Sequence, residues 1–96
     1  MIPNFIGLLE SWCRNAPRQN EASIHFSIGP VDRPKRSAWA EIENDRVTAQ
    51  VTVWVTGECE AEVDSIRDGR VLLRRSQTVA TEEDLTSVLD EVMSYL

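Results

Sequence analysis

The sequence is poor in the residues that most enzymes and metal sites need. It has one histidine, His25, and two cysteines, Cys13 and Cys59, among 96 residues. No pair of histidines or cysteines has the short spacing of a zinc ligand set or a redox motif. A glycine-rich phosphate loop and the Gly-x-Ser-x-Gly elbow of serine hydrolases are also missing. We therefore predict no catalytic residue, no metal site and no cofactor, and we interpret both cysteines as reduced core thiols.

Long apolar segments are missing too. No stretch approaches the roughly 20 apolar residues that a membrane-spanning helix needs. The first residues contain neither a basic region nor a small-residue cleavage pattern, which predicts a cytoplasmic protein without a secretory signal or a membrane contact. A chain of 96 residues can bury a single modest core, so we expect one domain over residues 1–96.

Positive charge is the other deficit. Ten Lys and Arg residues face sixteen Asp and Glu residues, which gives a formal net charge of -6 at pH 7. Such a field repels phosphate backbones, so nucleic-acid binding is not expected. Between positions 41 and 64 the single basic residue is Arg46. The acidic residues of that stretch are Glu41, Glu43, Asp45, Glu58, Glu60, Glu62 and Asp64. They form either a solvated sheet face or a face that binds a partner.

Two segments have the three- and four-residue apolar spacing of amphipathic helices. In the first, over residues 4–15, Asn4 is the expected N-cap and Trp12 belongs to the apolar stripe. Pro17 is expected to end this helix before a connection at residues 18–21. In the second, Thr81 is the expected N-cap, and the acidic residues after it suit the positive end of the helix dipole.

Between these helices apolar and polar residues alternate, which is typical of strands with one buried face. Turn residues separate five such strands, at residues 29–36, at Asn44-Asp45, at residues 56–58 and at Asp68-Gly69. The order of elements predicts an α+β fold: a five-stranded antiparallel meander sheet with the N- and C-terminal helices packed on one face.

The strand over residues 47–55 shows the clearest alternation, with its valines on the core side. A three-residue loop after this strand would pair Val55 with Cys59 and Val53 with Ala61. That register would place Glu60 beside Trp54, and Glu62 beside Thr52, on the opposite face. In the last strand the Leu72-Leu73 pair interrupts the alternation, so either leucine can face inward, and a bulge is one solution.

Two tryptophans occupy the polar side of neighbouring predicted strands, opposite the valines. Tryptophan is enriched at binding hot spots because it buries a large area with little entropy loss, and nearby carboxylates attract a basic partner. The alternative is that the loop over residues 29–36, or a dimer partner, covers the indoles. We predict a partner-binding surface made by Trp39, Trp54, Glu41, Glu60 and Glu62.

The run Trp54-Val55-Thr56-Gly57-Glu58 resembles the TriTu family of bacterial immunity proteins, small α+β antidotes to polymorphic toxins. Trp12 in the first helix, Ser37-Ala38 at the start of a strand and Asp84-Leu85 in the last helix are similar to the family's layout. The resemblance implies a non-enzymatic protein that binds a toxin stoichiometrically at its active site or an adjacent exosite. An acidic surface suits a toxin domain with a basic surface.

Two other functions stay open. A secretion-type chaperone or adaptor has a similar size and acidity and is often a dimer, so a homodimer is open for this chain as well. An enzyme or small-ligand protein would be favoured only if a concave pocket gathers His25 with acidic residues.

Overall fold

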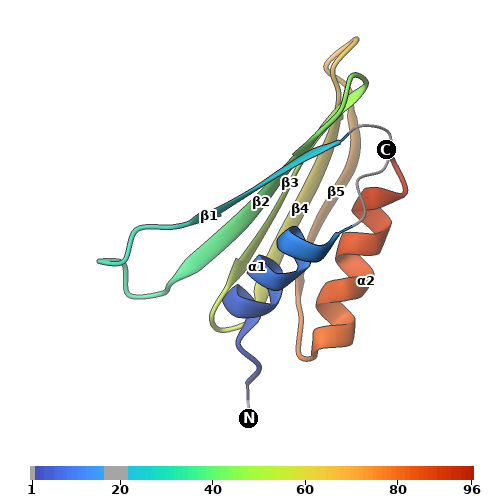
Figure 1. Ribbon diagram of the computed structural model, residues 1–96. Helices are drawn as coiled ribbons and strands as arrows, with labels where there is room; N and C mark the ends of the chain where they lie inside the picture. The colour runs from blue at the N-terminus through green and yellow to red at the C-terminus, as the bar shows by residue number, and fades with distance from the viewer. Residues whose placement is uncertain (1, 17–21) are drawn as a thin grey trace.

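The elements follow the order helix, five strands, helix in the computed structural model, which describes residues 2–16 and 22–96 (Figure 1). They are α1 (Phe5–Asn15), β1 (Ser23–Ile28), β2 (Ser37–Glu43), β3 (Val47–Trp54), β4 (Glu58–Ser65), β5 (Val71–Thr78) and α2 (Glu82–Met93). The strands form one antiparallel sheet in the order β1-β2-β3-β4-β5. This arrangement confirms the predicted α+β meander. The end of the first helix predicted at Pro17 and the connection after it lie outside the described residues.

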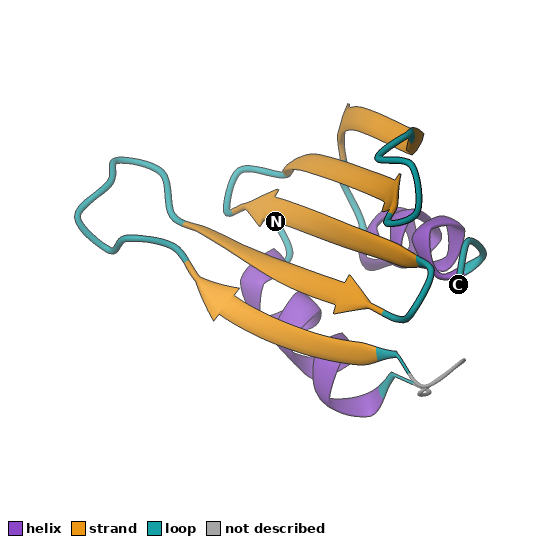
Figure 2. Ribbon diagram, turned by 90° about the horizontal axis from the view of Figure 1, so that it is seen from above, coloured by secondary structure: helices purple, strands orange, loops and turns teal. Residues whose placement is uncertain are grey.

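Both helices lie on the same face of the sheet (Figures 1 and 2). Helix α1 packs against β1, β2 and β3, and α2 packs against β4. The alternation along β3 places Val51 and Val53 on this face with 0% exposure, together with Leu9 of α1 and Leu89 of α2. No described element covers the opposite face of the sheet, which we call the open face. Neither described helix is both long and apolar enough to cross a membrane.

The two helices begin at their predicted caps. The Asn4 side chain accepts a hydrogen bond from the Gly7 backbone N–H (3.0 Å). At α2, the Thr81 hydroxyl accepts from the Asp84 N–H (3.1 Å), and the Asp84 carboxylate accepts from the Thr81 N–H (3.1 Å), which completes a capping box. A further hydrogen bond from the Ala80 N–H is the main reason that the pKa of Asp84 lies below its usual value.

The pairing of β3 with β4 differs from the predicted register by two residues. Val53 pairs with Cys59, so Val55 lies in the turn and is 37% exposed instead of buried. The Gly57 N–H donates to the Trp54 carbonyl (2.9 Å) and closes the turn directly after Trp54, and the positive φ of Gly57 (102°) then directs the chain back into β4. The prediction of a Val55–Cys59 pair was wrong for this reason.

A shift of two residues keeps every β4 side chain on its predicted face but changes its neighbours. Glu60 lies opposite Thr52, and Glu62 lies opposite Gln50. The predicted pairs of Glu60 with Trp54 and of Glu62 with Thr52 were therefore wrong.

The pairing of β4 with β5 contains the bulge that the double leucine allowed. Val63 pairs with Leu73, and Asp64 pairs with Val71, which leaves Leu72 as the extra residue. Both leucines are partly buried against the core, so neither is turned fully to solvent.

The β2–β3 turn is closed by the buried side chain of Asn44, which is 8% exposed. Its Oδ1 accepts hydrogen bonds from the backbone N–H groups of Arg46 (2.8 Å) and Val47 (2.9 Å). Its Nδ2 donates to the Leu96 carbonyl (3.4 Å). One side chain thus holds the turn and connects it to the segment after α2.

We expect Asn44→Ala to lower the free energy of unfolding by about 1–3 kcal/mol, because it leaves backbone donors in a buried turn without an acceptor. Urea denaturation measures this difference. Asp45→Ala is the control, since the Asp45 side chain is 90% exposed. An equal loss of stability in the two variants would contradict the role given to Asn44.

Candidate partner-binding face

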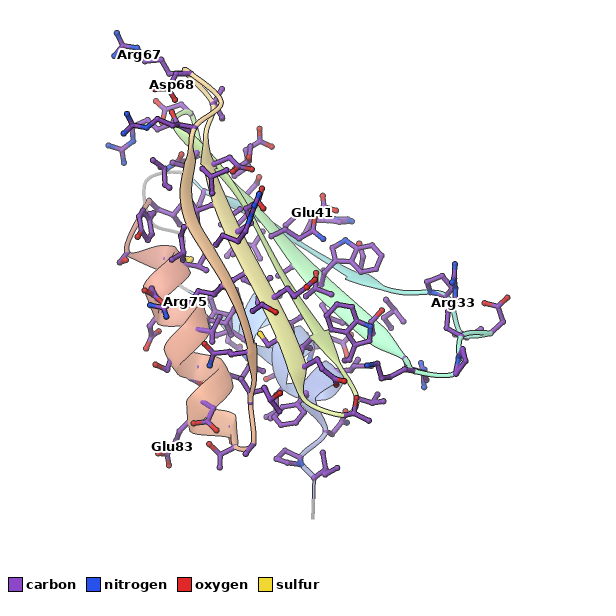
Figure 3. The ribbon with its side chains drawn as sticks, turned by 180° about the vertical axis from the view of Figure 1, so that it is seen from behind. Arg33, Glu41, Arg67, Asp68, Arg75 and Glu83 are labelled. Carbon is purple, nitrogen blue, oxygen red and sulfur yellow. The ribbon has the colours of Figure 1, made fainter. Side chains whose placement is uncertain are left out.

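The open face presents side chains in rows that cross the strands. One row contains His25, Glu41, Gln50, Glu62 and Arg74. The next row contains Ser27, Trp39, Thr52, Glu60 and Ser76. Trp54 follows Thr52 on the same side of β3, one row further along. In Figure 3, Glu41 lies on the side of the sheet away from the helices, whereas Arg75 lies on the side of α2, where it pairs with Glu91 (2.6 Å). The five predicted site residues thus share one face.

A hollow of about 690 Å³ lies over the middle of the open face. Residues from all five strands line it, and its acidic members are Glu41, Glu43, Glu60, Glu62 and Asp64. Glu43 and Glu60 are exposed, and neither pairs with a basic group among the described residues. The hollow therefore presents carboxylates that a cationic partner can reach. The predicted tryptophans do not line it but lie beside it.

Both tryptophans are half-buried, and the loop between β1 and β2 contributes to this. At the start of the loop, a Cβ on Gly29 would lie 3.4 Å from the Cζ3 atom of Trp39. At its end, the Lys35 ammonium lies 5.8 Å from the centroid of the Trp54 ring. The Trp39 indole N–H donates to Glu41 (3.0 Å). The loop thus covers part of each indole, and part of each remains open to a partner.

Glu62 is held by a cation, unlike Glu60. The Nε and Nη2 atoms of Arg74 each lie 3.1 Å from its Oε1 atom. A hydrogen bond between the Glu62 and Asp64 carboxyls lowers the pKa of Glu62 and raises that of Asp64. The Asp64 Oδ1 atom is buried and accepts no hydrogen bond from the described residues, which also favours a proton on this carboxyl. The Asp64 carboxyl therefore takes up a proton more readily than an ordinary aspartate, whereas Glu62 stays ionised more readily.

The run from Trp54 to Glu58 forms the turn at one end of the open face. A Cβ on Gly57 would lie 2.6 Å from the Val79 carbonyl oxygen, so only glycine fits here. The Val79 N–H donates to the Gly57 carbonyl (2.8 Å) and anchors the turn. Glu58 then accepts from Lys35 (2.6 Å) and contacts the Thr56 hydroxyl, and these bonds lower its pKa to about 2.

Lys35 and Glu58 are absent from the predicted site, although both contact it. The predicted register placed Glu60 beside Trp54, so the nearer carboxylate was overlooked. The basic composition of the loop at residues 33–36 was the signal that pointed to Lys35.

The family model described as Immunity protein TriTu matches residues 8–95. The chain belongs to the TriTu family of immunity proteins. No curated protein matches the chain. The family assignment favours a protein partner.

His25 is the one histidine of this TriTu sequence, and histidine is the residue most often used for acid–base catalysis. It is exposed on β1, opposite Glu41, and lines the hollow with the acidic residues. Within residues 2–16 and 22–96, no group of three or more His, Cys, Asp or Glu residues is arranged to hold a metal ion. The hollow therefore meets the condition set for the small-ligand alternative, a concave surface that gathers His25 with acidic residues.

Both cysteines of the TriTu chain lie in the core, as predicted. Cys13 is 6% exposed on α1, and Cys59 is 1% exposed on β4. Burial raises the pKa of the Cys59 thiol to about 11, because the apolar surroundings disfavour the thiolate. Cys59 is therefore a protonated, unreactive core residue.

Proposed function

We propose that this TriTu protein neutralises a bacterial toxin by binding it one to one through the open face, without catalysing a reaction. The observation that carries the proposal is the hollow of about 690 Å³ on the open face. Carboxylates line this hollow, and two half-buried tryptophans lie beside it. The opposite face is occupied by α1 and α2. The open face is thus the broad surface of the sheet that a partner can reach.

The charge of the open face defines the partner that fits it. Its carboxylates are Glu41, Glu43, Glu58, Glu60, Glu62 and Asp64. Among the described residues, the basic groups that pair with these carboxylates are Arg74 and Lys35. Such a surface attracts a toxin domain with a basic surface and accelerates the encounter, particularly at low ionic strength. The same charge opposes nucleic acid, and the proposal places the encounter in the cytoplasm.

The tryptophans and the carboxylates have different tasks in this proposal. Trp39 and Trp54 offer apolar area and can become fully buried against the toxin, where aromatic residues contribute most of the binding energy. Glu60 and Glu41 surround them with charge that sets orientation and association rate. Membership of the immunity-protein family favours this function over that of a secretion chaperone or adaptor.

A small-ligand or catalytic function is the alternative that the hollow itself raises. It gathers His25 with Glu41 and Glu62, the combination that an acid–base site requires. Two features oppose it: the Glu62 carboxylate is engaged by Arg74, and His25 is exposed on an edge strand. Catalytic sites usually exclude water from their acid–base groups.

We expect His25→Gln to leave neutralisation intact. The toxin is the protein that accompanies the tagged immunity protein from its native cell and that kills cells when expressed alone. Growth of cells that express both proteins measures protection, and light scattering of the purified complex measures its one-to-one stoichiometry.

Glu41→Gln is the matched comparison, because it changes the neighbour of His25 in the same row and removes a charge from the binding face. Its toxin affinity should fall while the His25 variant keeps the wild-type value. Loss of protection in a folded His25→Gln protein, with toxin binding unchanged, would support catalysis instead.

A further inference from the structure

Trp54, Thr56 and Glu58 form a corner at the end of the open face, which we call the Trp54 corner. The Lys35 ammonium lies 5.8 Å from the Trp54 ring centroid and 2.6 Å from the Glu58 Oε2 atom. An aromatic face and a carboxylate are the two groups that bind ammonium and guanidinium ions in proteins. The corner therefore has the chemistry of a cation site, and a side chain of the same protein occupies it.

The backbone of the corner is held more firmly than its occupant. Gly57 is anchored to Val79 by a hydrogen bond of 2.8 Å, and the Val55 N–H donates to the Arg36 carbonyl (3.0 Å). These contacts position the turn that presents Trp54 and Glu58. The Lys35 side chain, in contrast, is 43% exposed. Solvent screens its ion pair, so a competing cation can replace it without disturbing the turn.

The charge of Glu58 keeps the corner ready for a cation. The bonds from Lys35 and Thr56 lower the pKa of Glu58 to about 2, so its carboxylate is ionised at any physiological pH. When Lys35 leaves, an uncompensated carboxylate remains beside an indole. An arginine side chain suits this arrangement, because its planar guanidinium can stack on the indole ring and at the same time donate hydrogen bonds to the carboxylate.

We propose that the Trp54 corner is a subsite for a lysine or arginine side chain of the toxin, and that Lys35 occupies it until the toxin displaces it. This inference rests on the proposed function, because it assigns the partner's cation to one place on the open face. It makes Lys35 an internal competitor, not a contact that strengthens binding.

The test compares Lys35→Ala with Arg33→Ala. Both variants remove one positive charge from the same loop, but Arg33 is exposed at the tip of the loop, away from the sheet (Figure 3). Because Lys35 occupies the corner in the free protein, its removal should raise the apparent toxin affinity by about fivefold to tenfold, since a larger fraction of the protein becomes competent to bind. An unchanged affinity would overturn the inference. Arg33→Ala should keep the wild-type affinity. Adding Glu58→Gln to Lys35→Ala should abolish the gain.

A toxin-independent measurement uses arginine amide as the probe. Its titration should shift the Trp54 indole N–H signal in the nuclear magnetic resonance spectrum of Lys35→Ala, and should shift it far less in Arg33→Ala. Toxin affinity that rises equally in both variants would assign the effect to net charge and overturn the inference. Unchanged Trp54 signals in Lys35→Ala would overturn it too. A Trp54 shift in a protein that binds no toxin would retain the cation subsite and contradict the proposed function.

Discussion

Val51→Asp is expected to leave the domain unfolded at room temperature. Val51 has 0% exposure, and its partners on the two neighbouring strands, Ala40 and Ala61, offer no polar side chain to a carboxylate. An unpaired buried carboxylate costs several kcal/mol, against a total stability of about 5–15 kcal/mol for a domain. Far-ultraviolet circular dichroism and thermal melting measure the loss of structure.

Thr52→Asp is the control for that prediction. Thr52 is the next residue of β3, but it lines the hollow on the open face, where a carboxylate stays hydrated. We expect this variant to melt cooperatively at a temperature near that of the wild type. Equal destabilisation by the two substitutions would contradict a sheet with a single buried face.

Trp54→Ala is expected to weaken toxin binding by about 2 kcal/mol or more, which corresponds to about thirtyfold in affinity. The indole is half-buried in the free protein, so its remaining surface is available to the toxin. Truncation also removes the aromatic wall against which a toxin cation would stack. Calorimetry at low and high salt measures the affinity, and thermal melting of the free protein reports its stability.

Glu60→Gln is the matched rim variant, because Glu60 lines the hollow without an ion pair among the described residues. It should slow association and reduce the salt dependence, with a smaller effect on affinity. Adding Glu62→Gln extends the series, although Glu62 also contacts Arg74. Unchanged affinity in all these variants would contradict the open face as the interface. A Trp54 variant whose sole defect is a lowered melting temperature would give that residue a structural role.

Local patterns in the sequence predicted the elements and their faces well. Alternation along residues 47–54 is sufficient to separate core valines from polar residues, because successive side chains of a strand point to opposite sides. The same parity placed Trp39, Trp54 and the acidic residues on one face. The helix caps at Asn4 and Thr81 are likewise decided within a few residues of each helix. Features that depend on residues close together in the sequence, such as strand faces and helix caps, could therefore be predicted.

The contacts around the turn after Trp54 could not be predicted in this way. The β3–β4 register depends on Gly57 meeting Val79, a residue 22 positions further along the chain. A register that is shifted by two residues leaves all the faces unchanged, so the hydrophobic pattern cannot distinguish the two. The β4–β5 bulge could not be predicted for the same reason, since either residue of the Leu72-Leu73 pair satisfies the hydrophobic pattern.

The sequence by itself determined the α+β order, the buried valine face, the capped helices and an open face rich in carboxylates and tryptophan. Only the tertiary structure decided that a hollow gathers carboxylates from neighbouring strands, and that Lys35 reaches Trp54 and Glu58 from a distant loop. The physical reason is the sequence separation of the residues involved. Periodicity and capping follow from residues that are close together in the sequence, whereas a hollow and a cation site need distant segments that meet when the sheet assembles.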